Sequence, residues 1–185
     1  GLEKSSGEYI YFLDIDDMIE QDALSIINDS IVQTHADIIA FDSEDCDDAL
    51  IMYRTNSFRN KQIQRGEYES QEFVDLTLKA GTFHPVVWRY VFKRNFLMKC
   101  NHPFLPIIHE DCIYTIHHFK DSNMVFYLDS LLHKRRNVAA SITHKKISIE
   151  RLEGAFIVLE DANNIFCSCE TIKERNIYKR WNYFC

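Results

Sequence analysis

Three carboxylates follow the first strongly apolar segment of the sequence. Asp14, Asp16 and Asp17 come directly after residues 9–13, whose β-branched and aromatic side chains are typical of a strand buried on both faces of a parallel sheet. Ligands of open α/β sheets bind beyond the carboxyl ends of strands. Because one residue separates Asp14 from Asp16, both can approach one hard cation, Mg²⁺ or Mn²⁺, that bridges phosphate oxygens. The alternative is a solvated acidic turn in which Asp17 caps the next helix.

A second acidic pair and a basic run occur later in the chain. Glu110 and Asp111 follow a loop bracketed by Pro103 and Pro106, at the expected start of a helix, where carboxylates suit the positive end of the helix dipole. The basic run, residues 134–136, could bind phosphate through its guanidinium groups, or it could form a solvated basic face.

These groups need strands and helices to bring them together. We expect a helix over residues 20–34, with Leu24, Ile27 and Ile31 on its buried face, and then a strand over residues 36–41. This order of strand, helix and strand is a βαβ unit, which indicates an α/β fold.

The rest of the chain alternates between the same two kinds of element. The polar segment 42–65 is expected to form a hairpin or an excursion at the edge of the sheet. Ser70 is a candidate N-cap for a helix that Gly81 ends, and Pro85 opens an extended segment followed by a short helix. Further expected elements are a helix over residues 112–120, a strand over 124–128, and extended chain over 131–136 that continues to 143. The C-terminal residues are expected to be helical, with Ile149, Leu152, Phe156, Leu159 and Phe166 at intervals of three and four.

Composition excludes several classes of protein. The chain has 185 residues, which suits one domain, and its net charge of −7 is opposite to that of a nucleic-acid-binding protein. No apolar run approaches the roughly 20 residues that span a bilayer. The chain has 5 glycines and contains no Gly-rich phosphate-binding loop. Its 6 cysteines include no C-x-x-C pair, which fits the reduced thiols of a cytosolic protein.

Four segments together resemble the family 2 glycosyltransferases. GEYIYFLDIDDMI is similar to the D-x-D strand of that family, and VVWRYVFKRNFL to its W-x-x-x-Y/F-K-R segment. IIHEDCIYT resembles the E-D-x-x-x-T helix start, and HKRRNVAASIT resembles the Y-Y-x-R-x-x-x-x-S-I segment. They occur in the family's order and cover about residues 1–143.

The resemblance implies a GT-A fold, a mixed α/β sheet flanked by helices, and a role for each matched residue. Asp14 and Asp16 would bind Mn²⁺ or Mg²⁺ and the diphosphate of a nucleotide-sugar donor, UDP-sugar first, with Asp17 in support. Asp111 would be the general base of an inverting transfer to a glycan or lipid-linked hydroxyl acceptor. The remaining implied site residues are Arg136 at the diphosphate and Trp88, His109 and Glu110 in the acceptor or sugar pocket.

The resemblance also implies a domain division and a location. Residues 1–143 would be the later part of a GT-A catalytic domain that lacks its N-terminal nucleotide-binding portion, and residues 144–185 a helical extension. We therefore expect the 185-residue chain alone to bind nucleotide weakly and to transfer no sugar. By family analogy the enzyme would build bacterial surface polysaccharide in the cytoplasm, with peripheral association at the inner face of the plasma membrane.

Two other functions remain open at the level of sequence. The segment FLDIDD also resembles the first motif of HAD phosphatases, in which Asp14 would be the nucleophile and Asp16 the acid/base. The residues that follow, Met18 and Ile19, depart from that family. The second alternative is a non-catalytic relic or interaction module.

Overall fold

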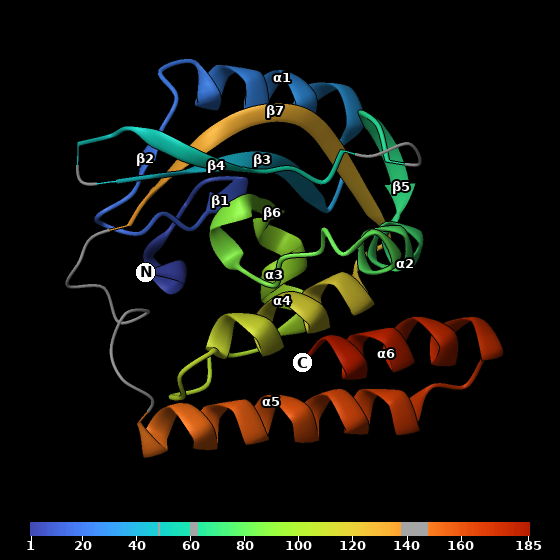
Figure 1. Ribbon diagram of the computed structural model, residues 1–185. Coiled ribbons are helices and arrows are strands. Elements are labelled where there is room, and N and C mark those ends of the chain that lie inside the picture. The colour runs from blue at the N-terminus through green and yellow to red at the C-terminus, as the bar shows by residue number, and fades with distance from the viewer. Residues whose placement is uncertain (48, 60–62, 138–147) are drawn as a thin grey trace.

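The protein is a mixed α/β structure built on one curled sheet, to which the described residues contribute seven strands (Figure 1). The computed structural model describes residues 1–47, 49–59, 63–137 and 148–185. The sheet has the path β1-β6-β3-β7-β2, and β4 and β5 pair with β3 and β7 respectively. The strands are β1 Tyr9–Tyr11, β2 Met18–Ile19, β3 Ile38–Cys46, β4 Met52–Asn56, β5 Gly66–Glu69, β6 Tyr90–Lys93 and β7 Met124–Arg136.

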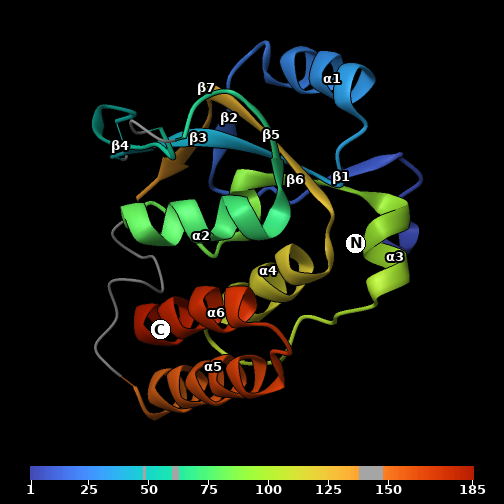
Figure 2. The ribbon, with the colours of Figure 1, turned by 90° about the vertical axis from the view of Figure 1, so that its right-hand side faces the viewer.

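Helices cover both faces of this sheet (Figures 1 and 2). Helix α1 lies on one face, and α2, α3 and α4 lie on the other, with α5 and α6 forming a further layer beyond α4 and α2. The helices are α1 Ala23–Thr34, α2 Ser70–Ala80, α3 Arg94–Cys100, α4 Glu110–Asp121, α5 Ile149–Ser168 and α6 Ile172–Phe184, with 3-10 turns η1 Leu2–Lys4 and η2 Val87–Arg89. The predicted α/β fold with a C-terminal helical segment is confirmed.

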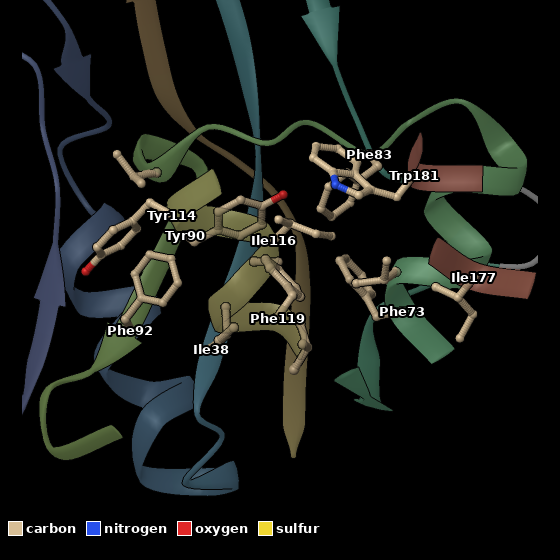
Figure 3. Close-up of a cluster of buried hydrophobic side chains, with 14 of the residues drawn as sticks. Ile38, Phe73, Phe83, Tyr90, Phe92, Tyr114, Ile116, Phe119, Ile177 and Trp181 are labelled. Carbon is tan, nitrogen blue, oxygen red and sulfur yellow. The ribbon is translucent and has the colours of Figure 1, made fainter. Parts of the chain in front are cut away.

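The main core lies between the sheet and the helices α2, α4, α5 and α6. Phe73 of α2 stacks on Phe119 of α4, and Phe83 contacts Trp181 of α6 edge to face (Figure 3). A smaller apolar cluster under α1 includes Ala23, Ile27 and Phe41. Because α6 contributes Ile177, Tyr178 and Trp181 to the main core, the C-terminal helices share it with the rest of the chain.

The prediction of a buried parallel strand for residues 9–13 is wrong. β1 spans only Tyr9–Tyr11, lies at one end of the strand path and pairs antiparallel with β6, so Tyr9 and Tyr11 are half-buried. The pairing of β3 with β7 is the one parallel pair among the described strands, and the other pairs are antiparallel. The run is apolar because Ile10 enters the core while its neighbours pack at the sheet's edge.

The predicted buried faces of two helices also need correction. In α1, Leu24 is exposed, whereas Ala23, Ile27 and Ser30 are buried. In α5, Phe156 is 69% exposed and Ile149 72% exposed. The buried face of α5 consists instead of Gly154, Val158, Ala162 and Ile165, since small side chains let this helix approach its neighbours closely.

Most predicted boundaries lie within a few residues of the observed ones. Glu69, and not Ser70, is the N-cap of α2, and Gly81 ends that helix with a left-handed backbone, φ 67°. The predicted strand over residues 124–128 and the extended chain predicted over 131–136 form one strand, β7. Residues 138–143 of the predicted extension, and the proposed boundary at 143/144, lie outside the described residues. Among the described helices, none is long and apolar enough to cross a membrane.

Candidate functional site

The acidic turn, residues 14–17, connects the end of β1 to β2. Its backbone closes on itself, because the N–H of Asp17 donates to the carbonyl of Asp14 at 3.1 Å. Asp17 turns inward, with its side chain 4% exposed, whereas Asp14 is the most exposed of the three carboxylates. In this turn Asp14 is exposed and Asp16 is half-buried, whereas Asp17 is the anchor.

Asp17 is anchored to β7 through both carboxylate oxygens. Oδ1 accepts a hydrogen bond from the backbone N–H of Arg136 at 2.9 Å. Oδ2 lies 3.0 Å from Nε2 of His133, whose side chain is completely buried. Beside this contact β2 pairs with β7, with Ile19 opposite His133. Asp17 thus joins the acidic turn to β7.

His133 also contacts the residue predicted for the sugar wall. The indole of Trp88 stacks on the imidazole of His133, with ring centroids 4.6 Å apart and an interplanar angle of 19°. Trp88 belongs to η2 and is half-buried. The structure therefore brings Trp88 to the same place as the acidic turn.

Asp111 lies in the first turn of α4, beside a cavity of about 490 Å³. The cavity is lined on one side by Pro85 and Val86 and on another by His109 and Glu110. His109 precedes the helix as its N-cap with a left-handed backbone, φ 75°, and its side chain makes no capping hydrogen bond. All three residues predicted at this helix start, His109, Glu110 and Asp111, therefore line one hollow.

Burial changes the acid strength of Asp111. Desolvation, followed by the charge of Glu110, raises the pKa of Asp111 to about 7, although the backbone N–H of Val87 donates a hydrogen bond that opposes the rise. A carboxyl group with a pKa near neutrality is suited to exchange protons with a substrate at physiological pH. Val87 adjoins Trp88, so η2 connects Asp111 to the stack on His133.

Charges in the acidic turn and at the start of α4 affect one another's pKa values. The charge of Asp14 contributes to the raised pKa of Asp111, and the charge of Glu110 contributes to the raised pKa of Asp14. The larger causes for Asp14 are partial desolvation and then the charges of Asp17 and Asp16. The charge of Asp14 is the smallest of the causes that act on Asp111, and the charge of Glu110 is the smallest of those that act on Asp14. The two acidic groups, far apart in sequence, are therefore close enough to interact weakly through their charges.

The three residues of the basic run differ in their partners. Lys134 pairs with Glu20 at 2.6 Å and with Glu44 at 3.6 Å, and Arg135 pairs with Asp45 at 3.9 Å. Among the ion pairs of the described residues none includes Arg136, and its buried Nε has no hydrogen-bond partner there. Arg136 is thus the member of the run whose guanidinium group has no ion-pair partner among the described residues.

The acidic turn fits a cation that the substrate helps to hold. Asp14 and Asp16 offer hard oxygen ligands, and a nearby positive charge would offset the repulsion that raises the pKa of Asp14. In the described part of the chain no group of three or more His, Cys, Asp and Glu side chains is arranged around a metal position. This donor set suits Mg²⁺ or Mn²⁺, which commonly take one or two carboxylates and complete their coordination with phosphates and water.

Sequence reasoning missed two residues of this site. His133 occurs where the family prefers aromatic residues, and Tyr11, in β1, places its hydroxyl 2.7 Å from Nδ1 of His133. The only signal in the sequence was the exchange of an aromatic residue for histidine, because the contacts depend on which residues of β2 and β7 are paired.

No protein-family model matches this sequence, and no curated protein does. Among solved structures, the chain is similar to TarS of S. aureus, a glycosyltransferase. TarS 1-349 in complex with UDP-GlcNAc superimposes with a TM-score of 0.72 at 13% identity, over 99% of this chain and 50% of that one. TarS 1-349 in complex with UDP gives 0.68 at 14% identity, over 95% and 45%.

The chain spans about half the length of the TarS chains that it matches. Because nearly all of its residues are included at a TM-score well above that of unrelated folds, the architecture is shared even though few residues are identical. This protein has the fold of the glycosyltransferase TarS.

Proposed function

We propose that this protein is a family 2 glycosyltransferase, which transfers a sugar from a nucleotide-diphospho-sugar to a hydroxyl acceptor with inversion. The observation that carries the proposal most is the fold shared with TarS, which has been crystallised with UDP-GlcNAc and with UDP. On this fold the charge of Asp14 contributes to the raised pKa of Asp111, and the charge of Glu110 contributes to the raised pKa of Asp14. A UDP-sugar is accordingly the donor to test first.

The chain's own residues would divide the reaction between two sides of the donor sugar. On one side Asp111 would accept the proton of the acceptor hydroxyl as its oxygen attacks the anomeric carbon, and a positioned base is worth roughly 10² to 10⁴ in rate. On the other side the bond from that carbon to the diphosphate oxygen would break. Attack from the face opposite the leaving group inverts the anomeric configuration.

The leaving diphosphate would meet the acidic turn and Arg136. When bound, a Mg²⁺ or Mn²⁺ ion held by Asp14 and Asp16 would supply positive charge to the diphosphate oxygens. The guanidinium group of Arg136, anchored by its backbone to Asp17, would add a second positive charge with the fork geometry that suits phosphate. Trp88 offers an indole that could stack on a sugar ring, and His109 and Glu110 would contact the acceptor from the cavity wall.

The resemblance to family 2 also extends the proposal to acceptor and location. We infer a glycan or lipid-linked acceptor in the synthesis of bacterial surface polysaccharide, with the enzyme in the cytoplasm at the inner face of the plasma membrane. The phosphatase alternative lacks support in the fold, since Asp14 follows an antiparallel strand at one end of the described sheet path.

The experiment that tests the function is a donor screen on the full-length protein. Release of UDP from UDP-sugars, beginning with UDP-GlcNAc, is measured with Mn²⁺ and a panel of glycan acceptors, and the anomeric configuration of any product is determined by NMR. We expect acceptor-dependent UDP release and an inverted product. Release of phosphate from p-nitrophenyl phosphate without donor binding would support the phosphatase reading instead. Nucleotide-sugar binding without transfer would support the relic.

A further inference from the structure

One buried side chain contacts three residues of the candidate site. The imidazole of His133 lies 2.7 Å from the hydroxyl of Tyr11 through Nδ1 and 3.0 Å from the carboxylate of Asp17 through Nε2. Its ring face is stacked on Trp88 at 4.6 Å. The side chain has no exposed surface, so its polar atoms and one ring face are all engaged by the site.

The partners decide how the hydrogen bonds of His133 run. An ionised carboxylate only accepts, so Nε2 of His133 carries the hydrogen and donates to Asp17. Nδ1 of His133 shares its hydrogen bond with the hydroxyl of Tyr11. Burial raises the pKa of Tyr11 well above its usual value, which keeps this hydroxyl protonated. Both ring nitrogens of His133 therefore have a hydrogen-bond partner within the site.

The two sides of the site meet at this ring. Through Asp17, His133 holds the acidic turn whose backbone also carries Asp14 and Asp16. Through Trp88, its ring supports η2, the segment whose Val87 N–H donates to Asp111. We propose that His133 is a positioning residue for sugar transfer, which fixes the acidic turn by hydrogen bonding and the orientation of Trp88 by stacking. This inference rests on the proposed function.

Two substitutions separate the hydrogen bonds of His133 from its stacking. His133→Phe keeps an aromatic ring against Trp88 but loses both hydrogen bonds. His133→Gln retains an N–H that can reach Asp17 but loses the ring. The readouts, on full-length protein, are the Kd for UDP with Mn²⁺ and the emission of Trp88 in a Trp181→Phe background, which leaves Trp88 as the single tryptophan of this chain.

Each substitution is expected to affect mainly one of the two readouts. His133→Phe should weaken UDP binding roughly tenfold, as expected when a hydrogen bond to a charged group is lost, with little shift in Trp88 emission. His133→Gln should weaken UDP binding only about threefold but shift the emission of Trp88 to the red. Without the imidazole stacked on it, the indole is more exposed to water. Tyr11→Phe, which removes one hydroxyl, should give an intermediate loss of affinity and serves if His133→Phe does not fold.

A second buried histidine gives the matched control. His118 is fully buried and packs on Tyr114 with ring centroids 4.2 Å apart, away from the acidic turn. His118→Gln should lower the melting temperature without changing the Kd for UDP, as a purely structural histidine would.

Two outcomes would overturn the inference, and they are distinguishable. If Asp16→Asn loses UDP binding while His133→Phe binds as tightly as the wild type, or if both His133 variants change both readouts equally, His133 does not position the site. If the wild type itself binds no nucleotide diphosphate, the proposed function fails and the inference fails with it.

Discussion

At the residue scale the proposed chemistry depends on Asp111, a carboxyl group whose ionised form is destabilised by burial. Desolvation and the charge of Glu110 raise the pKa of Asp111 to about 7, so this group can hold a proton below neutrality and accept one above it. Its cavity also contains Glu110 and His109, and the turn with Asp14 lies within electrostatic reach. The ionised form of such a group is a base that can accept the proton of a sugar hydroxyl near neutral pH.

Replacement of Asp111 by asparagine should separate binding from transfer. Asp111→Asn removes the proton acceptor and leaves the acidic turn intact, so we expect kcat to fall by roughly 10² to 10⁴ while the Kd for UDP with Mn²⁺ changes little. The wild-type rate should rise with pH through about 7, where Asp111 loses its proton. Equal transfer rates in the two proteins would remove Asp111 from the role of base.

The same group should make the stability of the fold depend on pH. The pKa of Asp111 in the folded protein is about 7, against about 3.9 in an unfolded chain. Between these values the folded state holds a proton that the unfolded state has lost, so the free energy of unfolding decreases as the pH rises from about 4 to about 7. Through this group the loss is at most about 4 kcal/mol.

Urea unfolding without divalent cations measures this effect. Asp111→Asn does not titrate, so its stability relative to the wild type should increase across the interval from about pH 4 to about pH 7. A difference between the two proteins that stays constant with pH would contradict the raised pKa of Asp111.

Asp16 is the residue whose loss should affect donor binding most directly. Asp16→Asn removes one of the two carboxylates available to a divalent cation, so we expect the Mn²⁺-dependent part of UDP binding to be lost. Asp29→Asn, an exposed change of the same charge on α1, is the matched control and should bind as the wild type does. Calorimetry with and without EDTA makes the comparison, and a Mn²⁺-dependent affinity retained in Asp16→Asn would contradict the assignment.

At the element scale, local motifs were predictable from the sequence and partners across the sheet were not. The acidic turn, the helix α1, the end of α2 at Gly81 and the start of α4 at Glu110 all follow from local capping and periodicity. The contact of His133 with Asp17 joins residues 116 positions apart. It depends on the antiparallel register of β2 and β7, which no short pattern specifies.

The buried face of α5 shows the same limit. Its large apolar side chains repeat at helical spacing, yet Phe156 is exposed and the contact face contains Gly154, Val158 and Ala162. A hydrophobic repeat predicts that the large apolar side chains form the buried face of a helix. Where a helix packs closely against a loop, small side chains are favoured at the contact instead. The backbone of Ile108, in the loop before Asp111, lies directly against Gly154.

Gly154→Ala should therefore destabilise the protein although alanine is the better helix former. An added Cβ would overlap the carbonyl oxygen of Ile108, which we expect to cost about 1–3 kcal/mol against a gain of about 1 kcal/mol in helix propensity. Thermal unfolding measures the balance, with the exposed Glu160→Ala on the same helix as control. A higher melting temperature for Gly154→Ala would show that α5 does not press on this loop.

At the scale of the whole molecule, the sheet brings the two acidic groups together. β7 begins close after the end of α4 (Figure 1) and extends to the anchor of the acidic turn. η2 connects Asp111, through the N–H of Val87, to the stack of Trp88 on His133. The predicted fold class was confirmed because alternating strands and helices leave few architectures. The predicted direction of the first strand was wrong, since an apolar run does not distinguish an antiparallel strand at the end of the path from a buried parallel one.

The most direct test of the account is a crystal structure of the full-length protein with UDP and Mn²⁺, with anomalous scattering recorded at the manganese edge. The account predicts one manganese peak in contact with the carboxylate of Asp16 and with the diphosphate of UDP. UDP bound elsewhere, or bound with manganese away from both Asp14 and Asp16, would contradict it.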